Sequence, residues 1–190
     1  MKTLIVSGGI GSGKSVVCDS LKARGIPVYD CDSRARELYE TLPGLLPRIE
    51  EALGQSFTSP DGKLDRKALS ERIFSDSAAR HTLESILYPA LLDDFKAWRS
   101  SRTESVVALE SAVILSKPVF DGVGDYVIWV EASRSERISR VMKRDGMARD
   151  EVLRRIEAQE SCVSKADIVI NNDGSLEKLS RTLECVLKKI

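Results

Sequence analysis

The segment TLIVSGGIGSGKSVV, residues 3–17, constrains the fold of this 190-residue chain more than any other part of its sequence. A short apolar run leads into glycines, and the pattern G-x-x-x-x-G-K-[ST] is satisfied by Gly8, Gly13, Lys14 and Ser15. Glycines at these positions let the backbone wrap around an anion with its N–H groups, and the N-terminus of a following helix adds a favourable partial charge. A structural glycine turn is the alternative. The position of the motif between a predicted strand and a predicted helix favours a nucleotide-binding P-loop.

Two side chains of this motif are expected to contact the nucleotide directly. Lys14 would reach the β- and γ-phosphates, and the hydroxyl of Ser15 would bind Mg²⁺. The motif therefore predicts a phosphate-binding site that also holds a metal ion.

Alternation of short apolar runs with helical segments predicts an α/β fold. A helix is expected after the P-loop, because Val17 and Leu21 lie one turn apart and Gly25 is placed to end it. Four further buried strands are expected at IPVYD, SVVALE, YVIWVEA and DIVIN. Strand–helix–strand units build parallel sheets. We therefore expect a three-layer P-loop NTPase fold, with a five-stranded parallel sheet, helices on both faces, a helical insertion and a lid.

Helical periodicity fills the middle of the chain, from Ser33 to about Trp98. Asp65 is expected to cap one helix of this region, and Pro89 to mark a kink or the first turn of a new helix. Later in the chain, SRSE at residues 133–136 has the pattern of a capping box. The whole chain, residues 1–190, is read as one domain with a core of about residues 1–33, 99–133 and 163–190, an insertion of about residues 34–98 and a lid of about residues 134–162.

Composition excludes several classes of function. The 29 basic and 29 acidic side chains cancel, so the overall charge favours neither nucleic acid nor an anionic membrane as a partner. The four cysteines are scattered and there is one histidine, so we expect neither a zinc site nor disulfides, but buried thiols in a reducing compartment. The opening apolar run is too short for a secretory signal or a membrane span, which predicts a cytoplasmic protein. We expect small-molecule partners and a monomer or weak homo-oligomer.

Carboxylates follow two of the predicted strands. Asp30 and Asp32, in YDCD, come at the end of the second strand, beside the place where a P-loop ligand would lie. Either could accept a proton from an attacking hydroxyl or help to hold the metal, or could instead cap the next helix. Asp32 lies nearer the insertion and is our choice for the base. Glu110 ends SVVALE and could orient Mg²⁺ or a water, or could pair with Arg66 or another cation.

Arg137, Arg140 and Arg144 fall at i, i+3 and i+7 of a predicted helix, so they share one stripe. Such a stripe could clamp the migrating phosphoryl group, since arginine stays charged and matches phosphate oxygens. A solvated face paired with Glu136 is the alternative, but the glycine turn that follows in a P-loop protein favours a mobile lid. Asn171 and Asn172 follow the last strand, where a loop could contact an adenine or form an amide-tied turn.

Along essentially its whole length, the sequence resembles the dephospho-CoA kinase family. The likeness is carried by GGIGSGKS, GIPVYDCDSRARELY, DGKLDRKALSERIFSDSAARHTLESILYPAL, RISRVMKRDGMARDEVLRRIEAQ and ADIVINNDGSLEKL, in this order. The first segment fits many kinases and ATPases, whereas the third and fourth are specific to this family. The resemblance implies ATP-dependent phosphorylation of the ribose 3′-hydroxyl of dephospho-CoA with Mg²⁺, and a CoA-binding insertion with a lid.

Carried across by position, the family's base falls on Asp32, its lid arginines on Arg140 and Arg144, and its adenine-side asparagine on Asn172. Arg66 lies in a family motif on the acceptor side. The catalytic residues predicted are Asp32, Lys14, Arg140 and Arg144. Nucleotide binding is predicted for Gly9, Gly11, Ser12, Gly13, Lys14, Ser15, Val16 and Asn172, acceptor binding for Asp30, Asp32 and Arg66, and metal binding for Ser15.

Four departures distinguish the chain from the family pattern. Tyr88 stands where the family usually has histidine before a proline, and VILSKPVF lacks the family's glutamate after the third strand. The link between Gln159 and Ala166 is about three residues shorter than usual, and Val16 replaces the commoner threonine. A kinase of the same build with another acceptor is the nearest alternative. A nucleotide-dependent switch is a second alternative, but the N-K-x-D motif of a GTPase is missing from the sequence.

Overall fold

The computed structural model describes residues 1–159 and 161–188, and the chain divides into two compact units. The first, called the sheet unit below, comprises Met1–Asp30 and Thr103–Ile190. The second, called the helical unit, comprises Cys31–Arg102. Each unit contains its own set of buried apolar side chains, so each has a core.

The sheet unit is built on five parallel strands in the order β2-β3-β1-β4-β5. The central strand β1 is buried from its second residue onward, as a strand covered on both faces should be. The bounds are β1 Lys2–Gly8, β2 Val28–Asp30, β3 Val106–Glu110, β4 Tyr126–Glu131 and β5 Ile168–Asn171. All five carboxyl ends reach the same edge of the sheet, which is where ligands of such sheets bind.

One face of the sheet is covered by two helices from opposite ends of the chain. Leu4 and Val6 of β1 belong to one buried cluster with Val17 of α1 and Leu183 of α8. The opposite face includes Ile5, which lines a hollow together with residues of the short 3-10 helices after β3. The bounds are α1 Lys14–Lys22, α8 Leu176–Leu187, η1 Ile114–Ser116, η2 Pro118–Phe120 and η3 Val163–Lys165.

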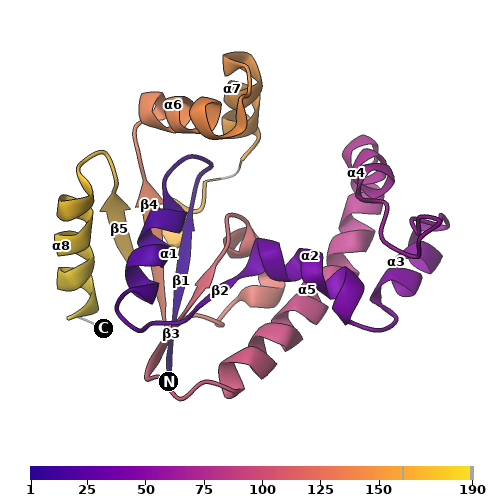
Figure 1. Ribbon diagram of the computed structural model, residues 1–190, viewed down its shortest axis with the longest axis horizontal. Helices are drawn as coiled ribbons and strands as arrows, with labels where there is room; N and C mark the ends of the chain where they lie inside the picture. Colours follow the sequence, from indigo (N-terminus) through magenta and orange to yellow (C-terminus); the bar gives the residue numbers. More distant parts are fainter. Residues whose placement is uncertain (160, 189–190) are drawn as a thin grey trace. The chain divides into compact units, whose positions relative to one another are not determined.

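Two further helices, α6 (Arg134–Asp145) and α7 (Arg149–Ala158), lie side by side beyond the carboxyl edge of the sheet, at the top of Figure 1. They share a small apolar cluster of Ile138, Val141 and Val152. Gly146 ends α6 with a φ of +66°, the left-handed conformation that glycine adopts without strain. Ile10 of the P-loop packs against this cluster, so the two helices lie next to the segment that follows β1.

The helical unit contains four α-helices. Asp65 caps α4 by accepting from the N–H groups of Lys67 and Ala68, which confirms that expectation. Arg34 of α2 forms a forked ion pair with Asp94 of α5, with Nη2 2.7 Å from Oδ1 and Nε 3.0 Å from Oδ2. The bounds are α2 Cys31–Thr41, α3 Leu45–Leu53, α4 Arg66–Ser75 and α5 Ser77–Ser100.

Helix α5 runs without interruption through Pro89, so a new helix does not begin there. Proline removes one backbone hydrogen bond. Leu87 and Leu91, on either side of it, are both buried, and this packing holds the helix together. The alternative that Pro89 marks the first turn of a new helix is therefore wrong, and the predicted kink stays a prediction.

The five-stranded parallel P-loop fold is confirmed, whereas the cysteines are only partly as expected. Cys18 and Cys31 are buried, but Cys162 is half-buried and Cys185 is exposed, and none forms a disulfide within the described residues. Burial raises the pKa of Cys18 to about 12, so its thiol stays protonated at neutral pH. The described helices include none that is long and apolar enough to cross a membrane.

Candidate active site

The P-loop connects β1 to α1 and contains glycines in the left-handed backbone conformation. Gly11 and Gly13 have φ values of +76° and +93°. Gly13 precedes the first residue of α1, and among the described residues no side chain caps this helix. The first N–H groups of a helix have no partner within it, so this N-terminus can serve a bound anion.

Lys14 lies folded against the loop. Its Nζ donates to the carbonyl oxygen of Gly8 at 3.0 Å and lies 4.0 Å from Oε1 of Glu110. The two charged side chains are only 13% and 16% exposed, so their opposite charges offset each other where water is scarce. Of the two roles left open for Glu110, pairing with a cation is met by Lys14.

Three side chains that can offer oxygen ligands to a metal lie at this edge of the sheet unit. Asp30 and Glu110 occupy paired positions at the ends of β2 and β3, and Ser15 is exposed in the first turn of α1. Carboxylate and hydroxyl oxygens are ligands that Mg²⁺ accepts alongside nucleotide phosphates. The residues present therefore fit the metal that the motif predicts, although no cluster of three or more acidic, histidine or cysteine ligands occurs among the described residues.

Asn172 is 6% exposed and lies against the P-loop. Its Nδ2 donates to the carbonyl oxygen of Ser12 at 2.9 Å. A Cβ built on Gly13 would come within 2.1 Å of the same nitrogen, so the glycine makes this close approach possible. The side chain thus ties the end of β5 to the loop, and its predicted contact with adenine stays a prediction.

Arg140 reaches the same place from α6. Its Nη2 donates to the carbonyl oxygen of Asn172 at 2.7 Å, and its Nη1 to that of Ser12 at 3.3 Å. Glu136, one turn away, lies 3.5 Å from Nη2. Arg140 therefore joins three segments of the sheet unit at the P-loop.

The three arginines of the α6 stripe have different hydrogen-bond partners. Arg137 donates from Nε to the carbonyl oxygen of Ile10 at 2.8 Å, at the tip of the loop. Burial lowers the pKa of Arg137, whereas the charge of Glu131 favours its protonated form. Arg144 is 64% exposed and forms two hydrogen bonds with Asp145 instead, at 2.7 and 2.8 Å. Within the described part of the chain, Arg137 and Arg140 are hydrogen-bonded to the loop and Arg144 to Asp145, so the predicted catalytic role of Arg144 stays a prediction.

Gln159, just after α7, is a loop contact that the sequence reasoning missed. Its Oε1 accepts from the N–H of Ile10 at 2.7 Å, and its Nε2 donates to the carbonyl oxygen of Ala112 at 3.4 Å. No local pattern marks this residue, since its partners lie more than 40 positions away. A hollow of about 280 Å³ beside it is lined by Gly9, Ser12, Trp129, Val130, Glu131, Ala132, Arg137, Ile156, Gln159 and Ser161.

Of the three acceptor-side candidates, Asp30 ends β2 in the sheet unit, whereas Asp32 and Arg66 lie in the helical unit. Asp32 is exposed in the first turn of α2. Burial raises the pKa of Tyr88, and the charges of Glu84 and Asp32 act in the same direction. Burial also raises the pKa of Tyr39 to about 12, while the charge of Arg66 opposes this. The charge of Asp32 thus acts on Tyr88 and that of Arg66 on Tyr39, and all four residues belong to the helical unit.

Arg66 is half exposed, and its Nη2 lies 3.5 Å from Oε1 of Glu40. The predicted site residues are thus divided between the two units, the P-loop set in the sheet unit and Asp32 with Arg66 in the helical unit.

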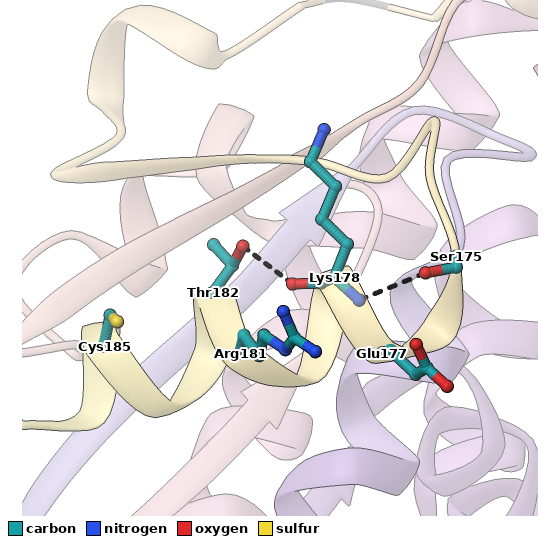
Figure 2. Close-up of a pocket in the computed structure, with 6 residues that line it drawn as sticks. All are labelled: Ser175, Glu177, Lys178, Arg181, Thr182 and Cys185. Carbon is teal, nitrogen blue, oxygen red and sulfur yellow. Dashed lines mark hydrogen bonds between the residues drawn. The ribbon is translucent and has the colours of Figure 1, made fainter.

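A second hollow, of about 390 Å³, lies along α8 (Figure 2). All of its lining residues come from α8 and the residue before it, and Lys178 extends away from the helix in this view. Thr182 Oγ1 and Ser175 Oγ are hydrogen-bonded to the backbone of Lys178, at 3.0 and 3.3 Å. None of the predicted site residues lines this hollow.

Comparison with known proteins gives consistent matches over the whole chain. The family model described as dephospho-CoA kinase matches residues 3–178. The dephospho-CoA kinase of Geobacter sulfurreducens is 37% identical over 196 residues, covering 100% of this chain and 98% of its own length. A crystal structure of a protein from Thermus thermophilus is 34% identical with a TM-score of 0.85, covering 100% of this chain and 97% of that one.

A more distant likeness concerns the fold alone. The crystal structure of shikimate kinase from Bacteroides thetaiotaomicron is 14% identical with a TM-score of 0.55, and the match covers 98% of each chain.

Proposed function

This chain belongs to the dephospho-CoA kinase family, and we propose that it transfers the γ-phosphoryl group of ATP to the ribose 3′-hydroxyl of dephospho-CoA, giving coenzyme A and ADP. The observation that carries this proposal is the family match over residues 3–178, which spans both the P-loop and the helical unit. The geometry of the loop supports the nucleotide half independently, because α1 presents an uncapped N-terminus behind left-handed glycines.

The donor side is assigned to the sheet unit. The loop amides cradle the phosphates, and Lys14 is close enough to the loop to exchange its bond with Gly8 for a phosphate oxygen. Ser15, with Asp30 and Glu110 nearby, would hold Mg²⁺, which when bound neutralises charge on the phosphates. Arg140 keeps the loop and the end of β5 together while adding positive charge near the nucleotide.

The acceptor side is assigned to the helical unit. Asp32 is exposed and can accept or orient the proton of the ribose hydroxyl as it attacks. Arg66 offers a half-exposed guanidinium for an anionic group of the acceptor. Tyr88 stands beside the charge of Asp32, so it can take part in positioning the acceptor in place of the family's histidine.

Residues 134–162 are proposed as a lid and residues 34–98 as the insertion that binds the acceptor. A lid that closes over the donor excludes water and so suppresses wasteful ATP hydrolysis. We propose a cytoplasmic enzyme with small-molecule substrates, acting as a monomer or weak homo-oligomer.

The acceptor is tested by measuring ADP release with Mg²⁺–ATP in the presence of dephospho-CoA, adenosine, shikimate or no acceptor. Release that depends on dephospho-CoA, with a product heavier by one phosphoryl group at the 3′ position, is the expected result. Release that is equal with another hydroxyl compound would favour a kinase with a different acceptor. Nucleotide binding without turnover on any acceptor would favour a switch.

A further inference from the structure

Ile10 is one of the variable positions of the P-loop motif, yet its side chain is built into the α6–α7 pair. It packs against the cluster of Ile138, Val141 and Val152, the apolar interior of that pair. The tip of the loop therefore shares a small core with two helices that begin more than 120 residues later.

The backbone of Ile10 is held by the same pair of helices. Its N–H donates to Oε1 of Gln159 at 2.7 Å, and its carbonyl oxygen accepts from Nε of Arg137 at 2.8 Å. One partner lies on α6 and the other directly after α7. Both polar groups of a single loop residue are thus satisfied by side chains, not by neighbouring backbone.

The loop and α6 also lie so close together that there is no room for a side chain at Gly9 or Gly11. A Cβ built on Gly9 would lie 2.3 Å from Nη2 of Arg137, and one built on Gly11 would lie 2.6 Å from the carbonyl oxygen of Arg137. Gly9 and Gly11, at variable positions of the motif, therefore make this close contact possible. We call the set of Ile10, Arg137 and Gln159 the loop–lid contact.

We propose that the loop–lid contact couples the position of the α6–α7 pair to the arrangement of the P-loop amides, and that Gln159 is a positioning residue for phosphoryl transfer. The role of Gln159 in phosphoryl transfer rests on the proposed function. The effect on nucleotide binding can be tested without it. Oriented amides bind an anion better when they are fixed in advance, because less ordering is required on binding. Coupling of this kind is reciprocal, so a change in the P-loop must also affect the α6–α7 pair, and a change in the pair must affect the loop.

Gln159 can do this because an amide carries one acceptor and two donors. The acceptor holds the N–H of Ile10, and a donor reaches the carbonyl oxygen of Ala112, after β3. Leucine at this position keeps the size and loses both bonds, whereas glutamate keeps the acceptor and loses the donor. Comparing the two variants separates the bond to Ile10 from the volume of the side chain.

The test measures ADP affinity by calorimetry and amide hydrogen exchange of residues 9–13 in Gln159→Leu, Gln159→Glu and wild type. In Gln159→Leu we expect the Ile10 amide to exchange at least about tenfold faster and ADP to bind about tenfold more weakly, the usual effect of losing one such hydrogen bond. In Gln159→Glu the protection of the Ile10 amide should be retained. A matched control is Arg155→Gln, on the exposed face of α7, where the pair with Glu151 is lost and neither quantity should change.

Reciprocity is tested from the loop side with Ile10→Ala, which keeps both backbone bonds and removes the packing. Faster amide exchange in α6 and α7 is expected, together with a lower kcat. Unchanged ADP affinity and Ile10 exchange in a folded Gln159→Leu protein, or unchanged exchange of the helices in Ile10→Ala, would overturn the proposal. Failure of the wild type to phosphorylate dephospho-CoA would instead reject the proposed function, and the ADP measurements would still stand.

Discussion

Glycine at position 13 is required by two separate constraints. Its φ of +93° is strained for any residue with a Cβ, and the amide of Asn172 occupies the space where that Cβ would lie. The sequence motif anticipates the first constraint, because P-loops use glycine here. The second depends on Asn172, which arrives from the other end of the chain.

We predict that Gly13→Ala destabilises the protein more than a glycine substitution at another left-handed position. Gly122, in the same unit, has a φ of +75° with nothing within 4 Å of a built Cβ, so Gly122→Ala isolates the backbone strain. That strain should cost about 1–2 kcal/mol, and the overlap with Asn172 should add about 1–3 kcal/mol. Urea unfolding measures both variants. Equal losses would mean that Asn172 moves aside freely.

Asp32 carries the prediction for the chemical step. Asp32→Asn removes the proton acceptor but keeps the size of the side chain, so kcat should fall by about 10²–10⁴-fold while ATP affinity stays nearly intact. Steady-state kinetics with dephospho-CoA and calorimetry with ADP separate these effects. Asp93→Asn, at an exposed site on α5, is the control. Turnover within a few-fold of wild type would reject Asp32 as the base.

At the scale of secondary structure, local signals predicted most elements and missed their long-range partners. Ser133 caps α6 as the capping box predicts, accepting from the N–H of Glu136 at 3.4 Å. The reciprocal bond of the box is replaced, because the N–H of Ser133 donates to Asp173 at 2.7 Å. Glu136 pairs with Arg140 instead. Asp173, 40 positions away in the sequence, thus accepts the bond from the N–H of Ser133 that the capping box assigns to Glu136.

Helix α6 gives a prediction of its own, because it carries Arg140 to the loop. Arg140→Ala removes the bonds to Asn172 and Ser12, so we expect kcat to fall by about 10- to 100-fold. A change confined to KM would mean that Arg140 binds substrate and transition state equally. Lys143→Ala, on the exposed side of the same helix, should leave both constants near wild type.

The stripe of arginines on α6 shows why spacing alone could not settle the site. Arg137, Arg140 and Arg144 are equivalent by helical periodicity. In the structure, Arg137 and Arg140 contact the loop and Arg144 pairs with Asp145. Helical periodicity determines which residues lie on the same face of a helix. The position of each residue along the helix axis determines which part of the protein its side chain contacts.

For the molecule as a whole, ligand binding and stability should be linked through the sheet unit. A ligand at 100 times its Kd adds about 2.7 kcal/mol to the free energy of unfolding, which for a chain of this size is a rise in Tm of roughly 5–10 °C. We expect this rise with Mg²⁺–ADP and a smaller one when EDTA is added, because Ser15 and the nearby carboxylates favour the metal-bound nucleotide. Thermal unfolding followed by circular dichroism measures it. An unchanged Tm at saturating Mg²⁺–ADP would contradict nucleotide binding at the loop.

The amino-acid sequence by itself determined the P-loop, the parallel α/β order and the helical middle of the chain, since each depends on residues that are close together along the backbone. Tertiary structure alone decided that Lys14 lies beside Glu110, that Asn172 lies against Gly13 and that Gln159 holds Ile10. The physical reason is one of range. Turns, caps and periodicity act over a few residues, whereas the partners of the loop are selected by the sheet order, which brings the ends of β1, β3 and β5 to one edge.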